Sequence, residues 1–158
     1  MLSLSSLFWA VFITLIALIT LVDARTYKIP NKILIVLSIT GVVSLLVLHP
    51  EKTGCHLLAA AITLVIGYAL YSFTGFGAGD AKFFSAITLW FGVDGILPLL
   101  YWFGICCAFL VVVLVVGRRL LDKTQHWLRE WRPLQKDAPV PLALAIGPAA
   151  IATWLCCY

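Results

Sequence analysis

The sequence contains little charge. Only 11% of its 158 residues are Asp, Glu, Lys or Arg, whereas 63% are hydrophobic. A soluble domain of this length needs a more polar surface than these residues supply, so the composition excludes an ordinary water-soluble globule and indicates a membrane protein. The first apolar stretch also lacks a basic start and a small-residue cleavage site, so we expect a retained helix rather than a removed secretory signal.

Metal-binding and disulfide patterns are also missing. The five cysteines lie inside apolar segments and form no CxxC pair: Cys55, Cys106, Cys107, Cys156 and Cys157. This placement argues against a zinc site and against a disulfide framework, and it fits small buried hydrophobic side chains. We therefore expect no metal and no organic cofactor.

Long apolar runs dominate the rest of the sequence. A bilayer core about 30 Å thick needs roughly 20 apolar residues per helix. The sequence predicts six such helices in a single domain, at about residues 4–22, 31–48, 55–74, 81–96, 98–117 and 139–157. The fourth is extended beyond a short charge-free run, with Asp94 at the far interface and Pro98 opening the next helix. The expected fold class is all-α, a polytopic membrane protein with about six transmembrane helices.

The basic residues fall almost entirely on one side of this arrangement. The connections after the first, third and fifth helices hold ten of the eleven Lys and Arg: Arg25, Lys28, Lys32, Lys82, Arg118, Arg119, Lys123, Arg129, Arg132 and Lys136. Only Lys52 falls on the other side. The positive-inside rule therefore places these connections in the cytoplasm and both termini outside it. Anionic membrane lipid accounts for the net charge of +4, so no nucleic-acid partner is expected.

The longest connection, Arg118 to Val140, has an amphipathic pattern. Apolar residues recur in it at helical spacing: Leu120, Leu121, Trp127, Leu128 and Trp131. Such a segment is typical of a helix lying in the headgroup plane, ended here by Pro133. The alternative is a fifth helix that continues straight into the cytosol.

Two of the seven acidic residues differ from the rest. Five occupy positions where a solvated surface charge is expected: Glu51, Asp94, Asp122, Glu130 and Asp137. Asp23 and Asp80 instead begin short motifs at the cytoplasmic edge of a helix. Pro30 and Asn31 follow Asp23, and a proline at a helix start, with an asparagine able to cap beside it, turns the connection sharply.

Asp80 follows a glycine-rich stretch. Gly75, Gly77 and Gly79 occupy three of the five positions before it, which weakens any helix and lets backbone or substrate approach closely. Non-helical backbone within a membrane is tolerated only where protein groups or a water-filled cavity supply hydrogen bonds to its N–H and C=O groups. We therefore expect a water-accessible notch beside Asp80.

Asp23 and Asp80 share the cytoplasmic side of the predicted topology. Two carboxylates about 3 Å apart share one proton, so that one acts as general base for water while the other donates a hydrogen bond to a scissile carbonyl. This is the requirement of an aspartic protease. Two independent snorkelling or capping aspartates are the alternative. The role of Lys82 also has two interpretations. Its side chain either contacts the acids or a substrate, or extends to lipid phosphates at the membrane surface.

The two motifs resemble the two signatures of type IV prepilin peptidases, the GxGD class of intramembrane aspartic proteases. The first is matched by Asp23, Ile29, Pro30 and Asn31, and the second by Gly77, Gly79, Asp80 and Lys82. The prolines of Pro139-Val140-Pro141, before the last helix, resemble a further family feature.

This resemblance implies a membrane aspartic endopeptidase with Asp23 and Asp80 as its catalytic pair. It implies that the substrates are type IV or Flp-type prepilins or pseudopilins, which lose a basic leader at the cytoplasmic face of the inner membrane. Long bacterial members carry an extra cysteine-containing region with methyltransferase activity, to which nothing in this sequence corresponds. The short form is similar to Flp, or tight-adherence, prepilin peptidases.

Two other functions stay open from the residues alone. Intramembrane acids also mark ion pathways, so a small proton-coupled carrier or channel is one alternative. A non-catalytic assembly factor of a pilus or secretion system is the other. Against the carrier, both acids lie at one membrane edge, and no acid lies near the middle of a predicted helix.

Overall fold

The computed structural model describes residues 4–74, 76–121 and 140–157. Its helices are α1 (Leu4–Thr26), α2 (Asn31–Leu48), the 3-10 helix η1 (Pro50–Lys52), α3 (Thr53–Thr74), α4 (Ala78–Phe91), α5 (Ile96–Leu121) and α6 (Ala143–Cys157). The described ranges contain no strand, so the predicted all-α class is confirmed. Residues 122–139, which include most of the predicted interfacial helix, lie outside the described part.

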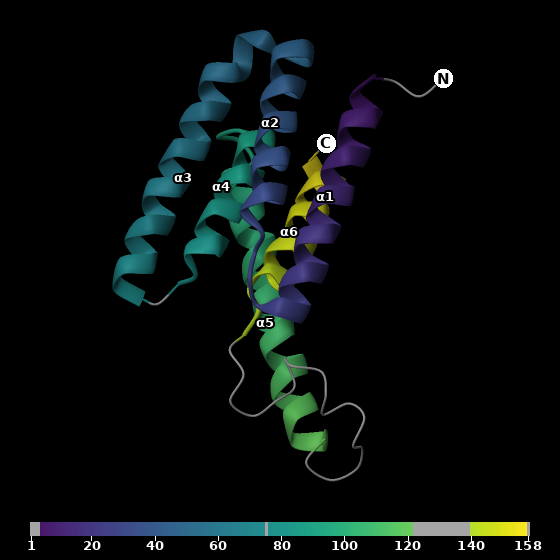
Figure 1. Cartoon of the computed structure of the whole chain (residues 1–158), viewed down its shortest axis with the longest axis vertical. Coiled ribbons are helices and arrows are strands. Elements are labelled where there is room, and N and C mark those ends of the chain that lie inside the picture. The colour runs from purple at the N-terminus through teal and green to yellow at the C-terminus, as the bar shows by residue number, and fades with distance from the viewer. Residues whose placement is uncertain (1–3, 75, 122–139, 158) are drawn as a thin grey trace.

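The helices run alternately in opposite directions along one axis (Figure 1). The start of α1, the end of α6 and the connection from α2 to α3 lie at one end of the molecule. The connections from α1 to α2 and from α3 to α4 lie at the other end, together with the far end of α5. This alternation brings Asp23, near the end of α1, and Asp80, near the start of α4, to the same end.

The helices differ in length. Four are long and apolar enough to cross a membrane: Leu4–Thr26, Asn31–Leu48, Pro50–Thr74 and Ile96–Gly117. The fourth predicted helix, residues 81–96, is instead Ala78–Phe91, because Gly92 adopts a φ of 68° and ends it early. These 14 residues span about 21 Å. The last helix has 15 residues and begins at Ala143, not near residue 139.

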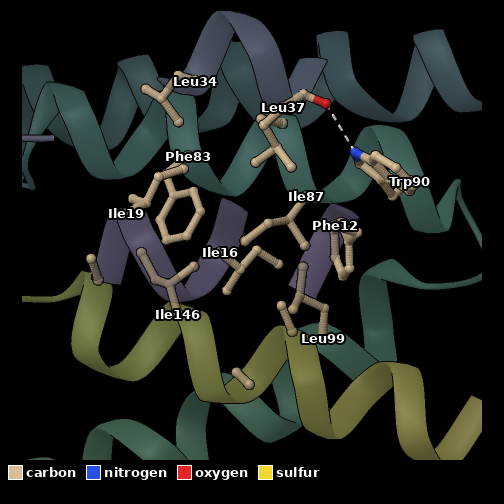
Figure 2. Packing of buried hydrophobic residues seen from close by; sticks show 14 of the residues in the cluster. Phe12, Ile16, Ile19, Leu34, Leu37, Phe83, Ile87, Trp90, Leu99 and Ile146 are labelled. Carbon is tan, nitrogen blue, oxygen red and sulfur yellow. Dashed lines mark hydrogen bonds between the residues drawn. The ribbon is translucent and has the colours of Figure 1, made fainter. Parts of the chain in front are cut away.

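The short helix α4 is the centre of the packing. Nine of its 14 residues are buried, including the unbroken run from Ser85 to Phe91. Its Phe83 and Ile87 lie among buried aliphatic side chains of α1, α2 and α6 (Figure 2). The Trp90 Nε1–H donates a hydrogen bond to the Leu37 carbonyl oxygen, 3.1 Å away. A helix surrounded by other helices is largely apolar around its circumference, which accounts for the buried run from Ser85 to Phe91.

Small residues and hydroxyl groups bring α3 against α4. A Cβ added at Gly67 would lie 2.8 Å from the Cβ of Ala81, so this close approach requires glycine. The hydroxyl oxygens of Thr63 and Thr88 lie 2.7 Å apart and form a buried hydrogen bond. Small-residue contacts and interhelical hydrogen bonds hold helices together in lipid, where apolar burial gives little driving force. These contacts fix α4, and with it the position of Asp80.

Candidate active site

Asp23 lies in the last turn of α1, which extends to Thr26 and so passes the predicted end at residue 22 by about one turn. The residue is only 5% exposed. Tyr27 follows the helix with a φ of 54° and donates its backbone N–H to the Asp23 carbonyl oxygen, 2.9 Å away. Glycine usually occupies such a left-handed cap. Here the cap turns the chain toward Pro30 and places Tyr27 in the site.

The Asp23 carboxylate contacts a distant part of the chain. The backbone N–H of Ala143, the first residue of α6, donates a hydrogen bond to it. Asp23 Oδ2 is buried and has no hydrogen-bond partner among the described residues. A buried polar oxygen without a hydrogen-bond partner destabilises the folded protein by about 1–3 kcal/mol. This oxygen is therefore available to a proton, a water molecule or a bound peptide.

Asp80 is the third residue of α4, and Gly77 is the N-cap of that helix. The Asp80 carboxylate folds back over the helix start, so that a Cβ added at Gly77 would collide with Asp80 Oδ2. Gly77 has φ −67° and ψ 131°, which any residue adopts. Glycine is thus required here for space and not for its backbone freedom. The free N–H groups at a helix start also favour a carboxylate in this position.

The two motifs touch each other. A Cβ added at Gly79 would lie 3.4 Å from the Cβ of Ile29, which is ordinary van der Waals contact. Pro30 is the extended N-cap of α2, and its carbonyl oxygen accepts the Ile33 backbone N–H at 3.0 Å. Asn31, which the sequence suggested as a capping residue, is instead the first residue of α2. The end of the first motif therefore lies against the start of α4.

A polar cavity of about 410 Å³ lies between the two motifs. Its lining consists of Asp23, Tyr27, Lys28, Ile29, Asn31, Gly77, Ala78, Gly79, Asp80 and Lys82. Both aspartates thus line one cavity, although their positions are 57 residues apart in the sequence. Of the eight site residues predicted from the sequence, Pro30 alone is not among these lining residues. The notch expected beside Asp80 is present as this cavity.

Asp80 lies outside the four membrane-length helices, in surroundings that disfavour its ionised form. Burial, and after it the negative charge of Asp23, raises the pKa of the Asp80 carboxyl to about 7. In general, two carboxyls that are close and coupled in this way can share one proton, and such a pair can supply one general base and one general acid. Lys82 is exposed and forms no ion pair with any residue of the described ranges.

Sequence reasoning missed four contributors to the site: Tyr27, Lys28 and Ala78, which line the cavity, and Ala143, which donates to Asp23. Tyr27 falls inside the first motif, but its residue type gives no sign of a left-handed cap. Ala143 contributes only its backbone N–H, which nearly every residue type has. The nearest signal in the sequence was Pro141, because a proline near a helix start predicts free backbone N–H groups close by.

No histidine or cysteine of the described residues lines this cavity. Within the described ranges, no three His, Cys, Asp or Glu residues lie together as a metal site would require. His49 and His56 lie around η1, at the opposite end of the molecule from the aspartates. His126 falls outside the described residues. The polar side chains of the cavity are two carboxyls, two lysines, the Tyr27 phenol and the Asn31 amide.

Comparison with known proteins gives a family for the chain. The model of the type IV leader peptidase family matches residues 10–115, about two thirds of the sequence. The matched range contains every residue that lines the cavity. Comparisons with curated proteins and with solved structures gave no match. The match spans the motifs and most of the membrane-length helices, so the chain belongs to the type IV leader peptidase family and is a membrane-embedded protease.

Proposed function

We propose that the chain is an aspartic endopeptidase that removes the basic leader from type IV or Flp-type prepilin or pseudopilin precursors, with Asp23 and Asp80 as its catalytic pair. Leader peptidase activity follows from the family. The aspartic mechanism rests on one observation: the two acids, one buried and one half-buried, line the same polar cavity. Two unrelated capping aspartates would have no reason to meet there.

In the proposed mechanism, one carboxyl is ionised and the other is protonated. The ionised carboxyl takes a proton from water as the water oxygen attacks the scissile carbonyl carbon, and the protonated carboxyl donates its proton to the carbonyl oxygen. The tetrahedral intermediate then breaks its C–N bond while one carboxyl protonates the leaving nitrogen and the other takes a hydroxyl proton. The pair ends with one proton, as it began, and the reaction needs no metal or organic cofactor.

A direct test is to co-express the chain with a prepilin and to follow the shorter, leader-cleaved product on a gel. The cleaved product should appear only with the wild-type chain, and sequencing of its new amino terminus should locate the cut after the basic leader. A proton-coupled carrier or an assembly factor would leave the prepilin at its full length. Absence of cleavage with every prepilin of the source organism would contradict the proposed function.

We also propose that the aspartate end of the molecule faces the cytoplasm, with the multi-pass chain in the inner membrane. Lys28, Lys32 and Lys82 lie at this end, whereas Lys52 lies in η1 at the other. The positive-inside rule favours the cytoplasm for the end that carries more basic residues. Lipid headgroups at that surface are the expected partners of these lysines.

This orientation predicts the labelling of single cysteines in a background without the native ones. Cysteine at Arg25 or Ala78 should react with a membrane-impermeant maleimide only after the cells are opened, because both positions lie at the basic end. Cysteine at Glu51 or Asp94 should react in intact cells. The readout is a gel shift with a large maleimide. Labelling of position 25 or 78 in intact cells would reverse the proposed topology.

The shared proton predicts a bell-shaped dependence of cleavage on pH. The pKa of Asp80 is about 7, so cleavage should fall as the pH rises past about 7 and the pair becomes doubly ionised. It should also fall in acid, where both carboxyls are protonated and no general base is left. The initial rate of leader release by the purified enzyme in detergent, at constant ionic strength, measures this. A rate that is flat from about pH 5 to about pH 9 would contradict a shared-proton mechanism.

A further inference from the structure

A groove runs along the membrane-embedded part of the molecule between α2 and α3. Both helices pack on α4 but make few contacts with each other, which leaves a hollow of about 480 Å³ with α4 as its floor. Ile35 and Ile39 of α2 form one wall, Leu64 of α3 forms the other, and Ser85 and Ala86 form the floor. The hollow thus follows from how the three helices pack.

The groove is suited to an apolar occupant. Beyond Asn31 and Lys82 at its cavity end, its large side chains are aliphatic, and its two hydroxyl groups already donate hydrogen bonds to backbone carbonyl oxygens of the same chain. Ser38 donates to Leu34 at 3.0 Å, and Ser85 donates to Ala60 at 2.7 Å. A polar occupant would therefore find few partners here, whereas a helix that satisfies its own backbone hydrogen bonds would need none.

This groove adjoins the aspartate cavity. Asn31 and Lys82 line both, so a chain that leaves the cavity past these two residues enters the groove. A third pocket, of about 150 Å³ between α3, α4 and α5, shares no lining residue with the cavity. It lies on the side of α4 where Ala81 packs tightly against Gly67.

The extent of the groove matches a short piece of helix. Its lining on α2 runs from Asn31 to Ile39, which is about 12 Å of helix and a little over two turns. Asn31 is the first residue of α2 and Ile39 lies near its middle. The groove therefore begins at the membrane edge that carries the aspartates and reaches toward the centre of the bilayer.

We propose that this groove binds the first two turns of the apolar helix that follows the scissile bond in the uncleaved substrate. The inference rests on the proposed function, because it takes the cut to occur between Asp23 and Asp80. A substrate bound between those acids has its charged leader at the cytoplasmic edge of the molecule. The segment that follows the cut must continue from there into the bilayer. This groove adjoins the cavity that holds the acids and offers apolar walls, so it is suited to the apolar helix that follows the cut.

Site-specific photo-crosslinking tests this assignment. p-Benzoylphenylalanine is placed at Ile39 or Leu64, which line the groove and are 57% and 42% exposed, and at the matched controls Val36 and Val65, which do not line it and are 46% and 69% exposed. The full-length chain carries Asp80→Asn so that substrate stays uncut, and the probe is a prepilin that the wild-type chain is first shown to cleave. Crosslinks to the prepilin should form from 39 and 64 and be far weaker from 36 and 65. Equal crosslinking from all four positions, or adducts with lipid only, would overturn the groove.

A second measurement uses the active enzyme. Ile39→Trp fills the groove, whereas Val36→Trp places the same ring on the neighbouring surface. We expect Ile39→Trp to raise KM about tenfold with kcat nearly unchanged, because it weakens binding that is equal in ground and transition states, and Val36→Trp to match wild type. Wild-type kinetics for Ile39→Trp would overturn the proposal. The groove proposal and the catalytic-pair proposal can fail independently. Crosslinking does not require cleavage, and the loss of cleavage in Asp80→Asn does not require the groove.

Discussion

Replacing either Asp23 or Asp80 by asparagine is expected to abolish leader cleavage, with a loss of roughly a thousandfold or more. Asparagine keeps the size of the side chain and an oxygen that accepts the Ala143 N–H at position 23, but it neither releases nor takes up the proton that the mechanism moves. The measurement is the fraction of co-expressed prepilin that loses its leader, with the amount of enzyme in the membrane determined by immunoblot.

Asp94→Asn is the matched control for this loss. Asp94 is exposed in the turn between α4 and α5, at the end of the molecule away from the cavity, so the variant should cleave as wild type does. The double variant Asp23→Asn/Asp80→Asn should be no worse than either single variant, because residues that act as one unit are strongly non-additive. Cleavage at the wild-type rate in either single variant, at an unchanged membrane level, would remove that residue from the mechanism.

The sequence could predict that the two motifs lie at the same end of the molecule, because this depends on the alternating direction of the helices and not on how closely they pack. Helices that cross a bilayer alternate in direction, so the ends of the first and third long helices must lie on the same side. Asp23 and Asp80 therefore reach one end of the molecule whatever the details of packing. Their motifs then meet because Ile29 lies against Gly79, a contact that the glycine permits but that no pattern in the sequence specifies.

The length of α4 and the cap at Tyr27 were not predictable for a different reason. Phe83 to Val93 carries no charged residue, and the absence of charge alone does not say whether lipid or other helices surround a segment. Packing on all sides lets α4 end at Phe91, where Gly92 turns the chain next to His56 of α3. The left-handed Tyr27 is similarly stabilised by tertiary context, because its residue type disfavours that conformation. The groove between α2 and α3 exists because these two helices make few contacts with each other. A hydrophobic pattern does not specify which pairs of helices make contact.

The Gly77→Ala variant should lower cleavage by about a hundredfold without unfolding the protein. Alanine adopts the backbone conformation of Gly77 without strain, but its methyl group would occupy the space of Asp80 Oδ2. The flexible side chain of Asp80 yields more easily than the backbone, so the carboxylate is displaced, and a shift of about 1 Å in a reacting group costs roughly this much in rate. The cleavage assay used for the aspartate variants measures the effect, and the thermal unfolding midpoint should change little.

Two glycine controls show whether Gly77→Ala acts through Asp80. Gly104→Ala, in α5, adds a methyl group with nothing within 4 Å and should cleave as wild type does. Gly79→Ala places its methyl group in ordinary contact with Ile29, 3.4 Å from the nearest atom, so its effect should be much smaller than that of Gly77→Ala. Because the displaced carboxylate leaves the partner that shares its proton, the basic limb of the pH profile of Gly77→Ala should also move to lower pH. Wild-type cleavage by Gly77→Ala, alongside an inactive Asp80→Asn, would show that the reaction does not need the Asp80 carboxylate where the structure places it.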